Sequence, residues 1–173
     1  MGDSRTSARA WIGTIVFLFL APGIVAGLIP WLITGWRPHE WGDAAWVVLP
    51  LGWLLIAGGV AFLLFAFALF AAHGGTPAPV APTRTLVVTG VYRFVRNPMY
   101  LAVLAIILGQ ALLFGSWGLL IYAALALAAV VTFVKTYEEP TLTRTYGEQY
   151  LEYRRHVPGW WPRFTPWRGS DGA

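Results

Sequence analysis

Two adjacent carboxylates, Glu138 and Glu139, follow the last long apolar run of the chain, and Lys135 comes just before them. Carboxylates at the end of a membrane helix cost free energy unless water or a cation compensates them. Their charge also opposes the dipole at a helix C-terminus, which favours cations. The compensating charge could come from Arg93, Arg96, Lys135 or a bound ammonium group. The pair therefore indicates either a solvated helix end or a binding site for a positively charged group.

A second candidate is the step from Asn97 to Pro98, which predicts the start of a helix. Asparagine is a preferred N-cap residue, and proline is favoured at the first helical position. The free backbone N–H groups of such a helix end attract a carboxylate or a phosphate. Arg93 and Arg96 add positive charge just before it, either for the same ligand or as anchors to anionic lipid headgroups.

The residue types argue against several other kinds of chemistry. The chain has no cysteine, which removes disulfides, thiolate nucleophiles and Cys-ligated metals. His39, His73 and His156 are scattered without metal-ligand spacing, so we expect no metal site. The net charge of +4 is small and dispersed, so we expect no nucleic-acid partner. In a membrane protein such an excess is typical of a basic cytoplasmic face.

The elements that must position these residues are apolar. Hydrophobic residues make up 57% of the chain and charged residues 12%, about half of the charged share of an average soluble domain. Residues 10–34 and 44–72 each form an apolar run long enough to cross a bilayer core of about 30 Å. Pro22 and Pro30 should bend or shorten the first helix. A signal peptide is the alternative interpretation of that run.

A third apolar block, residues 99–134, is too long for one helix and has Gly115 near its middle. We interpret it as two antiparallel helices over residues 98–114 and 117–137, tilted or ending in the headgroup layer. The predicted fold class is an all-α integral membrane protein with about four transmembrane helices, two of them N-terminal and two in a helical hairpin. Residues 1–173 would form a single membrane domain, with residues 10–72 as its N-terminal helix pair.

The distribution of basic residues predicts the orientation. Eleven of the twelve lysines and arginines fall on one side of these four helices, and only Arg37 falls on the other. Cytoplasmic loops carry such an excess, so both termini should lie in the cytoplasm, with the chain in the cell (inner) membrane.

The connecting and C-terminal segments complete the cytoplasmic side. Residues 73–83 are rich in Gly and Pro and read either as a linker or as an extended wall beside a site, and residues 84–88 are β-prone. Residues 145–148 fit a capping box that would open a short helix over residues 148–156. Its tyrosines, with Trp160, Trp161 and Trp167 after it, favour an interfacial anchor helix.

Taken together, these segments resemble the superfamily of isoprenylcysteine carboxyl methyltransferases and phospholipid methyltransferases. The resemblance rests on LVVTGVYR at 86–93, RNPMY at 96–100, EE at 138–139 and YGEQY at 146–150, followed by Tyr153, Val157 and Pro162. It covers residues 75–162, which would form the methyltransferase core. No single motif decides it, but the order and spacing of the motifs are specific.

The resemblance implies S-adenosylmethionine as cofactor, bound between the cytoplasmic loops and the helical hairpin. Carried over residue by residue, the cofactor-binding set is Arg84, Thr85, Leu86, Val87, Tyr92, Asn97, Pro98, Met99, Tyr100 and Glu138. Glu138 falls on the acidic residue that holds the cofactor's amino group. Lys135 and Glu139 fall on the substrate side, and no catalytic residue is assigned. The chain departs from the family at Asn97, which replaces a histidine, and at Val134, which replaces an arginine.

The implied function is methyl transfer to a lipophilic acceptor at the cytoplasmic membrane face. An in-line displacement depends on positioning and exclusion of water more than on a strong acid or base. The acceptor stays open between an isoprenylcysteine-like carboxylate, a phospholipid amine and another small lipid. Two alternatives remain: an NADPH-dependent sterol or isoprenoid reductase, which carries a similar C-terminal block, and a non-enzymatic membrane scaffold. Membrane lipids are the other expected partners.

Overall fold

The computed structural model describes residues 22–72, 86 and 88–169 of the chain. These residues form helices joined by turns and loops, and none of them belongs to a β-strand. They divide into two compact units. The apolar unit comprises residues 22–64 and 99–131, and the polar unit comprises residues 132–169 with the described part of residues 65–98.

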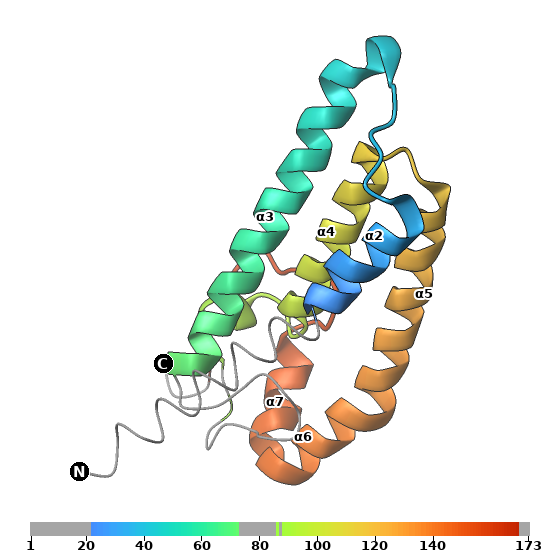
Figure 1. Cartoon of the computed structure of the whole chain (residues 1–173). Coiled ribbons are helices and arrows are strands. Elements are labelled where there is room, and N and C mark those ends of the chain that lie inside the picture. The colour runs from blue at the N-terminus through green and yellow to red at the C-terminus, as the bar shows by residue number, and fades with distance from the viewer. Residues whose placement is uncertain (1–21, 73–85, 87, 170–173) are drawn as a thin grey trace, which may run out of the picture. The chain divides into compact units, whose positions relative to one another are not determined.

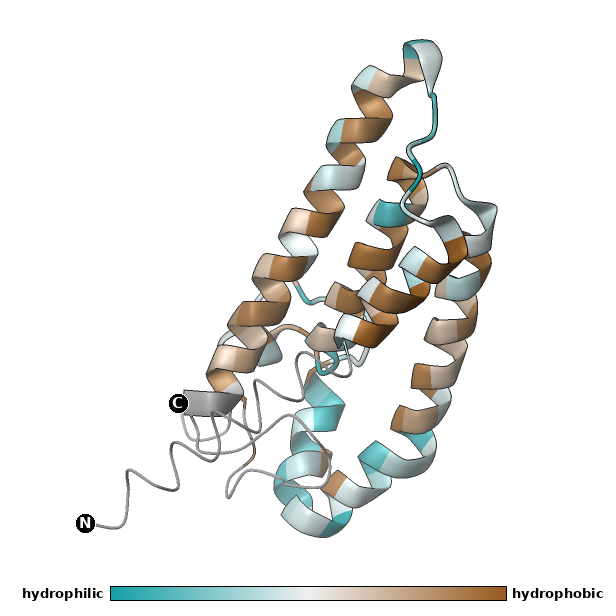
Figure 2. Cartoon of the chain, in the orientation of Figure 1, coloured by the Kyte–Doolittle hydropathy of each residue, from teal (hydrophilic) through white to brown (hydrophobic). Residues whose placement is uncertain are grey.

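The apolar unit is built from long helices that are hydrophobic along most of their length (Figures 1 and 2). The elements that lie wholly or mostly in this unit are, in chain order, η1 (Ile24–Leu28, a π-helical turn), α2 (Ile29–Thr34), η2 (Gly42–Ala44), α3 (Ala45–Ala72), α4 (Pro98–Leu113) and α5 (Trp117–Phe133). Helix α4 begins at Pro98, as predicted, and Gly115 turns the chain toward α5 with φ of 56°. The predicted helical hairpin is therefore confirmed.

The membrane prediction is supported in part. Two helical stretches, Gly42–Leu69 and Trp117–Tyr146, are long and apolar enough to cross a membrane, whereas Ile24–Thr34 and Pro98–Leu113 are shorter apolar helices. Residues 10–21 of the first predicted helix lie outside the described residues. The arrangement of four spans, and the side on which each end lies, stay predictions.

Small residues allow α3 and α4 to approach closely. A Cβ atom added to Gly59 would lie 2.9 Å from the Ala102 carbonyl oxygen, and one added to Gly109 would lie 2.7 Å from the Gly52 carbonyl oxygen. Glycines at such helix contacts let backbones pack against each other in an apolar medium, where dispersion contacts replace the hydrophobic effect. These glycines therefore fix the pairing of two apolar helices.

Pro30 does not end the first helix, but the hydrogen-bond register of the helix changes just before it. In η1 the Ile29 N–H is donated to the Ile24 carbonyl, five residues back, as in a π-helix. The next residue, Pro30, has no N–H to donate. The carbonyls of Val25 and Ala26 therefore lose the donors that an α-helix would give them.

Side chains of the helical hairpin supply the missing donors. The Tyr122 hydroxyl donates to the Val25 carbonyl at 2.9 Å, and the Gln110 side-chain amide donates to the Ala26 carbonyl at 2.6 Å. The oxygen of the same Gln110 amide accepts from the Trp36 indole at 3.2 Å. An unsatisfied backbone group costs several kcal/mol in a bilayer core, so these bonds tie the broken helix to α4 and α5.

The polar unit carries the hydrophilic helices of the chain (Figure 2). Its elements are η3 (Gly90–Arg93), η4 (Val134–Glu138, a second π-helical turn), α6 (Glu139–Tyr146) and α7 (Glu148–His156). An irregular segment, residues 157–169, follows α7. The predicted helix over residues 148–156 is thus confirmed with its boundaries.

Two expectations about this unit are wrong. The helix that contains α5 does not end near Tyr137 but continues through η4 and α6, so Glu138 and Glu139 lie inside it and not at its C-terminus. Helix α6 ends instead at Gly147, whose φ of 56° suits glycine. The capping box is also absent, because the Thr145 hydroxyl donates to the Thr141 carbonyl at 2.9 Å within α6, and Gly147 is the N-cap of α7.

The tyrosines of α7 lie in the core of the polar unit, not at a membrane interface. Tyr150 and Tyr153 are 2% and 3% exposed and pack with Val157 into a hydrophobic cluster. Leu86 and Val88 are among the residues packed against this cluster. The interfacial interpretation fails for these side chains because their spacing on α7 directs them toward a core that the 86–97 segment completes.

Candidate functional site

A largely buried ion pair forms the centre of the candidate site. The Arg96 Nη1 atom lies 2.7 Å from the Glu139 Oε1 atom, and the two side chains are 13% and 12% exposed. Arg96 lies in the loop before α4, and Glu139 is the first residue of α6, 43 positions later. Because charges removed from water need well-placed partners, this contact holds two distant segments in one arrangement.

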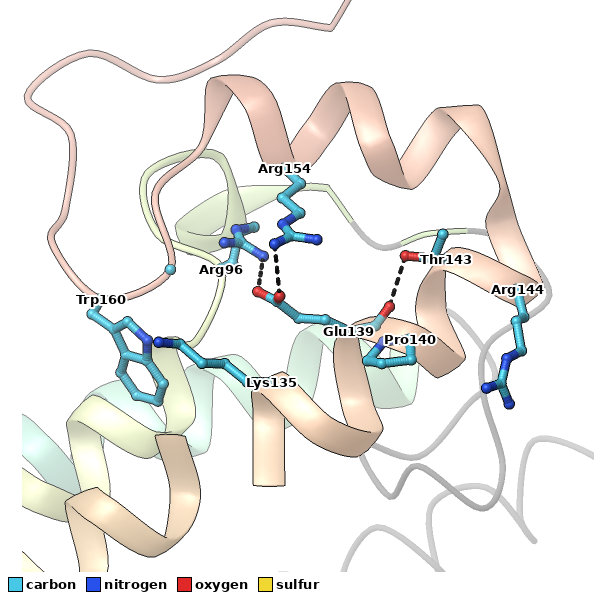
Figure 3. A pocket seen from close by; sticks show the side chains of 9 residues that line it. Arg96, Lys135, Glu139, Pro140, Thr143, Arg144, Arg154 and Trp160 are labelled. Carbon is cyan, nitrogen blue, oxygen red and sulfur yellow. Dashed lines mark hydrogen bonds and ion pairs between the residues drawn. The ribbon is translucent and has the colours of Figure 1, made fainter. Parts of the chain in front are cut away.

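A second cation and a phenol complete the network around this pair. The Arg154 Nη2 atom, from α7, lies 3.2 Å from the other Glu139 carboxylate oxygen (Figure 3). Arg96 also donates to the Val157 carbonyl at 2.9 Å and to the Tyr150 hydroxyl at 3.0 Å. Burial raises the pKa of the Tyr150 phenol, while the nearby Arg96 charge acts in the opposite direction. Tyr150 is therefore a neutral hydroxyl at physiological pH.

The C-terminal segment is bound to the loop before α4 by backbone hydrogen bonds. The N–H groups of Arg96 and Asn97 donate to the carbonyls of Pro158 and Gly159 at 3.0 and 3.2 Å. Farther along, Arg93 and Phe94 accept from Trp167 and Arg163 at 3.0 and 2.9 Å. The segment is thereby part of the site and fixes the position of the Arg96 side chain.

Asn97 contributes a buried donor that the described residues do not use. The residue is 7% exposed, and its Nδ2 atom has no hydrogen-bond partner among the described residues. A Cβ atom added to Gly159 would lie 3.4 Å from this nitrogen. A buried donor without an acceptor costs about 1–3 kcal/mol. Its presence beside the ion pair fits a ligand that brings an acceptor oxygen.

A cavity of about 610 Å³ opens beside the ion pair. It is lined by Arg96, Lys135, Glu139, Pro140, Thr143, Arg144, Arg154, Gly159 and Trp160 (Figure 3). Its lining includes four cationic side chains and one carboxylate, so the cavity has an excess of positive charge. Such a lining suits a ligand that carries an anionic group, and the volume suits a small molecule or a lipid headgroup.

A comparison with known protein families identifies the chain. The family model for phospholipid methyltransferases matches residues 47–149, which is more than half of the sequence. The chain belongs to the phospholipid methyltransferase family. Members of this family methylate lipid-like substrates in membranes, so the chain is a membrane methyltransferase. No curated protein matches the sequence closely enough to count as a relative.

Several of the site residues predicted for this phospholipid methyltransferase lie at the cavity or next to the loop that carries Arg96. Lys135 and Glu139, expected on the substrate side, both line the cavity. Asn97 and Pro98 are buried beside the loop that carries Arg96. The Tyr92 side chain is buried, and its carbonyl accepts from the Tyr153 hydroxyl at 2.7 Å.

Other predicted residues do not line the cavity or lie outside the described chain. Leu86 packs on the cluster of Tyr150, Tyr153 and Val157. Glu138, the last residue of η4, is not among the residues that line the cavity. Met99 and Tyr100 lie in the first turn of α4 and are half-buried. Arg84, Thr85 and Val87 lie outside the described residues.

The sequence did not point to the contributions of Arg154, Gly159 and Trp160. These residues reach the site from α7 and the segment after it, which had been interpreted as a membrane anchor. Arg96 had been named as one possible cation for the Glu138–Glu139 pair, and its ion pair with Glu139 confirms that expectation, but its place at the centre of the site was not predicted. The signal that could have singled it out is its place in the RNPMY motif, directly before the N-cap residue.

Proposed function

We propose that the chain transfers a methyl group from S-adenosylmethionine to a lipophilic acceptor at the cytoplasmic membrane face. The observation that carries the proposal is the cationic cavity around the Arg96–Glu139 pair, next to the buried Asn97 amide, whose nitrogen has no partner in the described part of the chain. The family supports transfer to a lipid-like substrate. When bound, S-adenosylmethionine would supply a methyl group on a sulfonium. The acceptor's nucleophile would bond to this methyl carbon in line with the breaking C–S bond, and S-adenosylhomocysteine would leave as a neutral thioether.

On the cofactor side, the residues of this chain bind and orient. The Asn97 amide offers its free N–H to an acceptor oxygen, and the Glu138 carboxylate pairs with an ammonium group. The wall of the cofactor site comprises Arg84, Thr85, Leu86, Val87, Tyr92, Pro98, Met99 and Tyr100. No step needs a strong acid or base from these side chains, because positioning supplies most of the rate enhancement.

On the acceptor side, Val134 stands where the family has an arginine, and the neighbouring Lys135 supplies a cation in its place. Lys135 attracts the polar end of the acceptor into the cavity. Glu139 has both carboxylate oxygens in ion pairs with Arg96 and Arg154. Glu139 therefore holds the cations of the cavity in place rather than accepting a proton. The nucleophile can be oxygen, nitrogen or sulfur, and the acyl or prenyl part of the acceptor stays in the bilayer.

The cationic lining also fits the phosphates of NADPH, which is the cofactor of the reductase alternative. Calorimetric titration of the purified protein with S-adenosylhomocysteine and with NADPH separates the two functions. We expect binding of S-adenosylhomocysteine only. Binding of NADPH alone would replace the methyltransferase proposal, and binding of neither would favour a scaffold.

Transfer itself is tested with labelled S-adenosylmethionine on membranes with and without the protein. We expect the label in an extractable lipid, and we expect Lys135→Met to lower its yield. The matched control is Arg155→Met, because Arg155 is exposed on α7 and does not line the cavity. Equal yields for the two variants would remove Lys135 from the acceptor side. A labelled lipid is absent altogether if the proposed function is wrong.

A further inference from the structure

Two aromatic side chains point outward from the segment after α7. Trp161 is 82% exposed, and Phe164 at 103% is the most exposed of the large apolar side chains among the described residues. Their neighbours Trp160 and Trp167 point inward, Trp160 to the cavity and Trp167 to the cluster around Tyr153. The segment therefore has one face that belongs to the site and one that exposes apolar rings.

The exposed rings sit on a backbone that is held on both sides. Before them, Pro158 and Gly159 accept the N–H groups of Arg96 and Asn97, and after them Trp167 donates its N–H to Arg93 at 3.0 Å. The Arg93 side chain returns a hydrogen bond to the Trp167 carbonyl at 2.6 Å. Exposing whole aromatic rings to water costs hydrophobic free energy, so a fixed loop that presents them indicates a surface that is covered in the functional protein.

The charges of this loop indicate what covers it. Residues 157–169 contain no acidic residue, and they contain two arginines, Arg163 and Arg168, on either side of Phe164 and its neighbours. Tryptophan and other aromatic rings favour the headgroup layer of a bilayer, and arginines beside them favour anionic lipids. Aromatic rings combined with arginines in a segment that has no acidic residue thus match an anionic lipid surface.

We propose that residues 159–168 form a membrane-contact loop that inserts the Trp161 and Phe164 rings into the headgroup layer of an anionic bilayer. Because the adjacent residue Trp160 lines the cavity, this contact holds one wall of the cavity at the lipid surface. A lipid headgroup then reaches the cavity without leaving the interface. The inference concerns an interaction surface and does not depend on which cofactor or acceptor the cavity binds.

The absence of cysteine from the chain allows a direct test. Phe164→Cys and Trp161→Cys are labelled with an environment-sensitive fluorophore in the full-length protein in nanodiscs. The matched control is Arg155→Cys, which labels an exposed position on α7 outside the loop. The nanodiscs contain either phosphatidylcholine alone or phosphatidylcholine with phosphatidylglycerol, and a part of the lipid carries a nitroxide near the headgroup.

We expect blue-shifted emission and strong lipid quenching at positions 164 and 161, and weak quenching at position 155. The quenching should be larger in the anionic nanodiscs than in those of phosphatidylcholine alone. Replacing Arg163 and Arg168 with Gln should reduce that difference, because each arginine should favour contact of the loop with the anionic bilayer by about fivefold. Quenching at 164 and 161 no stronger than at 155 would overturn the proposal. So would shielding that appears in detergent and grows with protein concentration, because a second copy would then cover the loop.

Discussion

The protein breaks two helices in the same way, once in each unit. In the apolar unit the π-helical turn η1 is followed by Pro30, and in the polar unit η4 is followed by Pro140. In both, the first residue after the turn donates its N–H five residues back, and the next residue is a proline without an N–H. The second and third carbonyls of each turn therefore lose their α-helical donors.

The two breaks differ in which donors are available to these carbonyls. In the apolar unit Ala26 is buried, and the side chains of Tyr122 and Gln110 donate to η1. In the polar unit the corresponding residues, Lys135 and Thr136, are exposed, so water or a ligand can reach this turn. A break in an apolar surrounding thus requires donors from the protein, whereas at an exposed break water can supply them.

The last residue of each turn and the residue after it show the same contrast in charge. Leu28 and Ile29 close the apolar break, whereas Glu138 and Glu139 close the polar one. The two breaks share one backbone pattern, a π-helical turn followed by a proline. Their side chains decide whether the break packs against other helices or forms part of a site. Variants of the two breaks, matched position by position, can therefore test this difference.

The largest effect should come from Glu139→Ala in the polar break. The change leaves Arg96 with a charge that is largely removed from water, and we expect it to lower the free energy of unfolding by about 3 kcal/mol. The control is Glu148→Ala, because Glu148 is the exposed first residue of α7 as Glu139 is the first residue of α6. Thermal unfolding in detergent measures both. Equal and small losses would mean that the pair behaves as a surface contact.

Glu138→Gln should act on binding rather than on stability. If the carboxylate pairs with the cofactor's ammonium, its loss should weaken S-adenosylhomocysteine binding by about 1.5–3 kcal/mol, which is about ten- to hundredfold. Glu148→Gln should leave the affinity unchanged. Calorimetric titration in nanodiscs measures both values, and an unchanged affinity for Glu138→Gln would move the ammonium site to another carboxylate.

These two carboxylates also show how far the sequence alone could lead. Hydropathy predicted the apolar helices, and the Asn97-Pro98 signal predicted the start of α4. The proline positions predicted bends, but the π register and the open carbonyls depend on hydrogen bonds that hydropathy does not encode. The continuation of the helix past Glu139 was missed because a proline that follows an apolar run, here Pro140, is also typical of a helix end.

The site was only partly predictable for a related reason. Lys135 and Glu139 were expected because they follow an apolar run and fit the family pattern. Arg154 and Trp160 reach the cavity through contacts with residues far away in the chain, and no local pattern reports such contacts. The same applies to the Tyr150 and Tyr153 rings, whose spacing fits an interfacial anchor and a core equally well until the 86–97 segment packs on them.

In the apolar break, Gln110→Leu should lower the free energy of unfolding more than any other replacement of one uncharged side chain. It removes the donor to the Ala26 carbonyl and the acceptor of the Trp36 indole, so we expect a loss of about 1–2 kcal/mol of unfolding free energy. Gln149→Leu is the matched control, because Gln149 is exposed on α7. If the two variants unfold at the same temperature, the Gln110 bonds contribute nothing measurable, and the contrast between the breaks loses its energetic basis.

The smallest effect, and the sharpest test of the comparison, is the coupling between Pro30→Ala and Gln110→Leu. Alanine at position 30 regains an N–H that can serve the Ala26 carbonyl, so the loss of the Gln110 donor should cost less in that background, by about 0.5–1 kcal/mol. The cavity left by replacing the buried proline enters the single variant and the double variant alike, so the cycle cancels it. Pro140→Ala combined with Gln110→Leu is the control, and its two effects should add because the residues lie in different units. Strict additivity in the Pro30 cycle, measured by unfolding in detergent, would mean that Gln110 binds the helix for a reason other than the missing N–H.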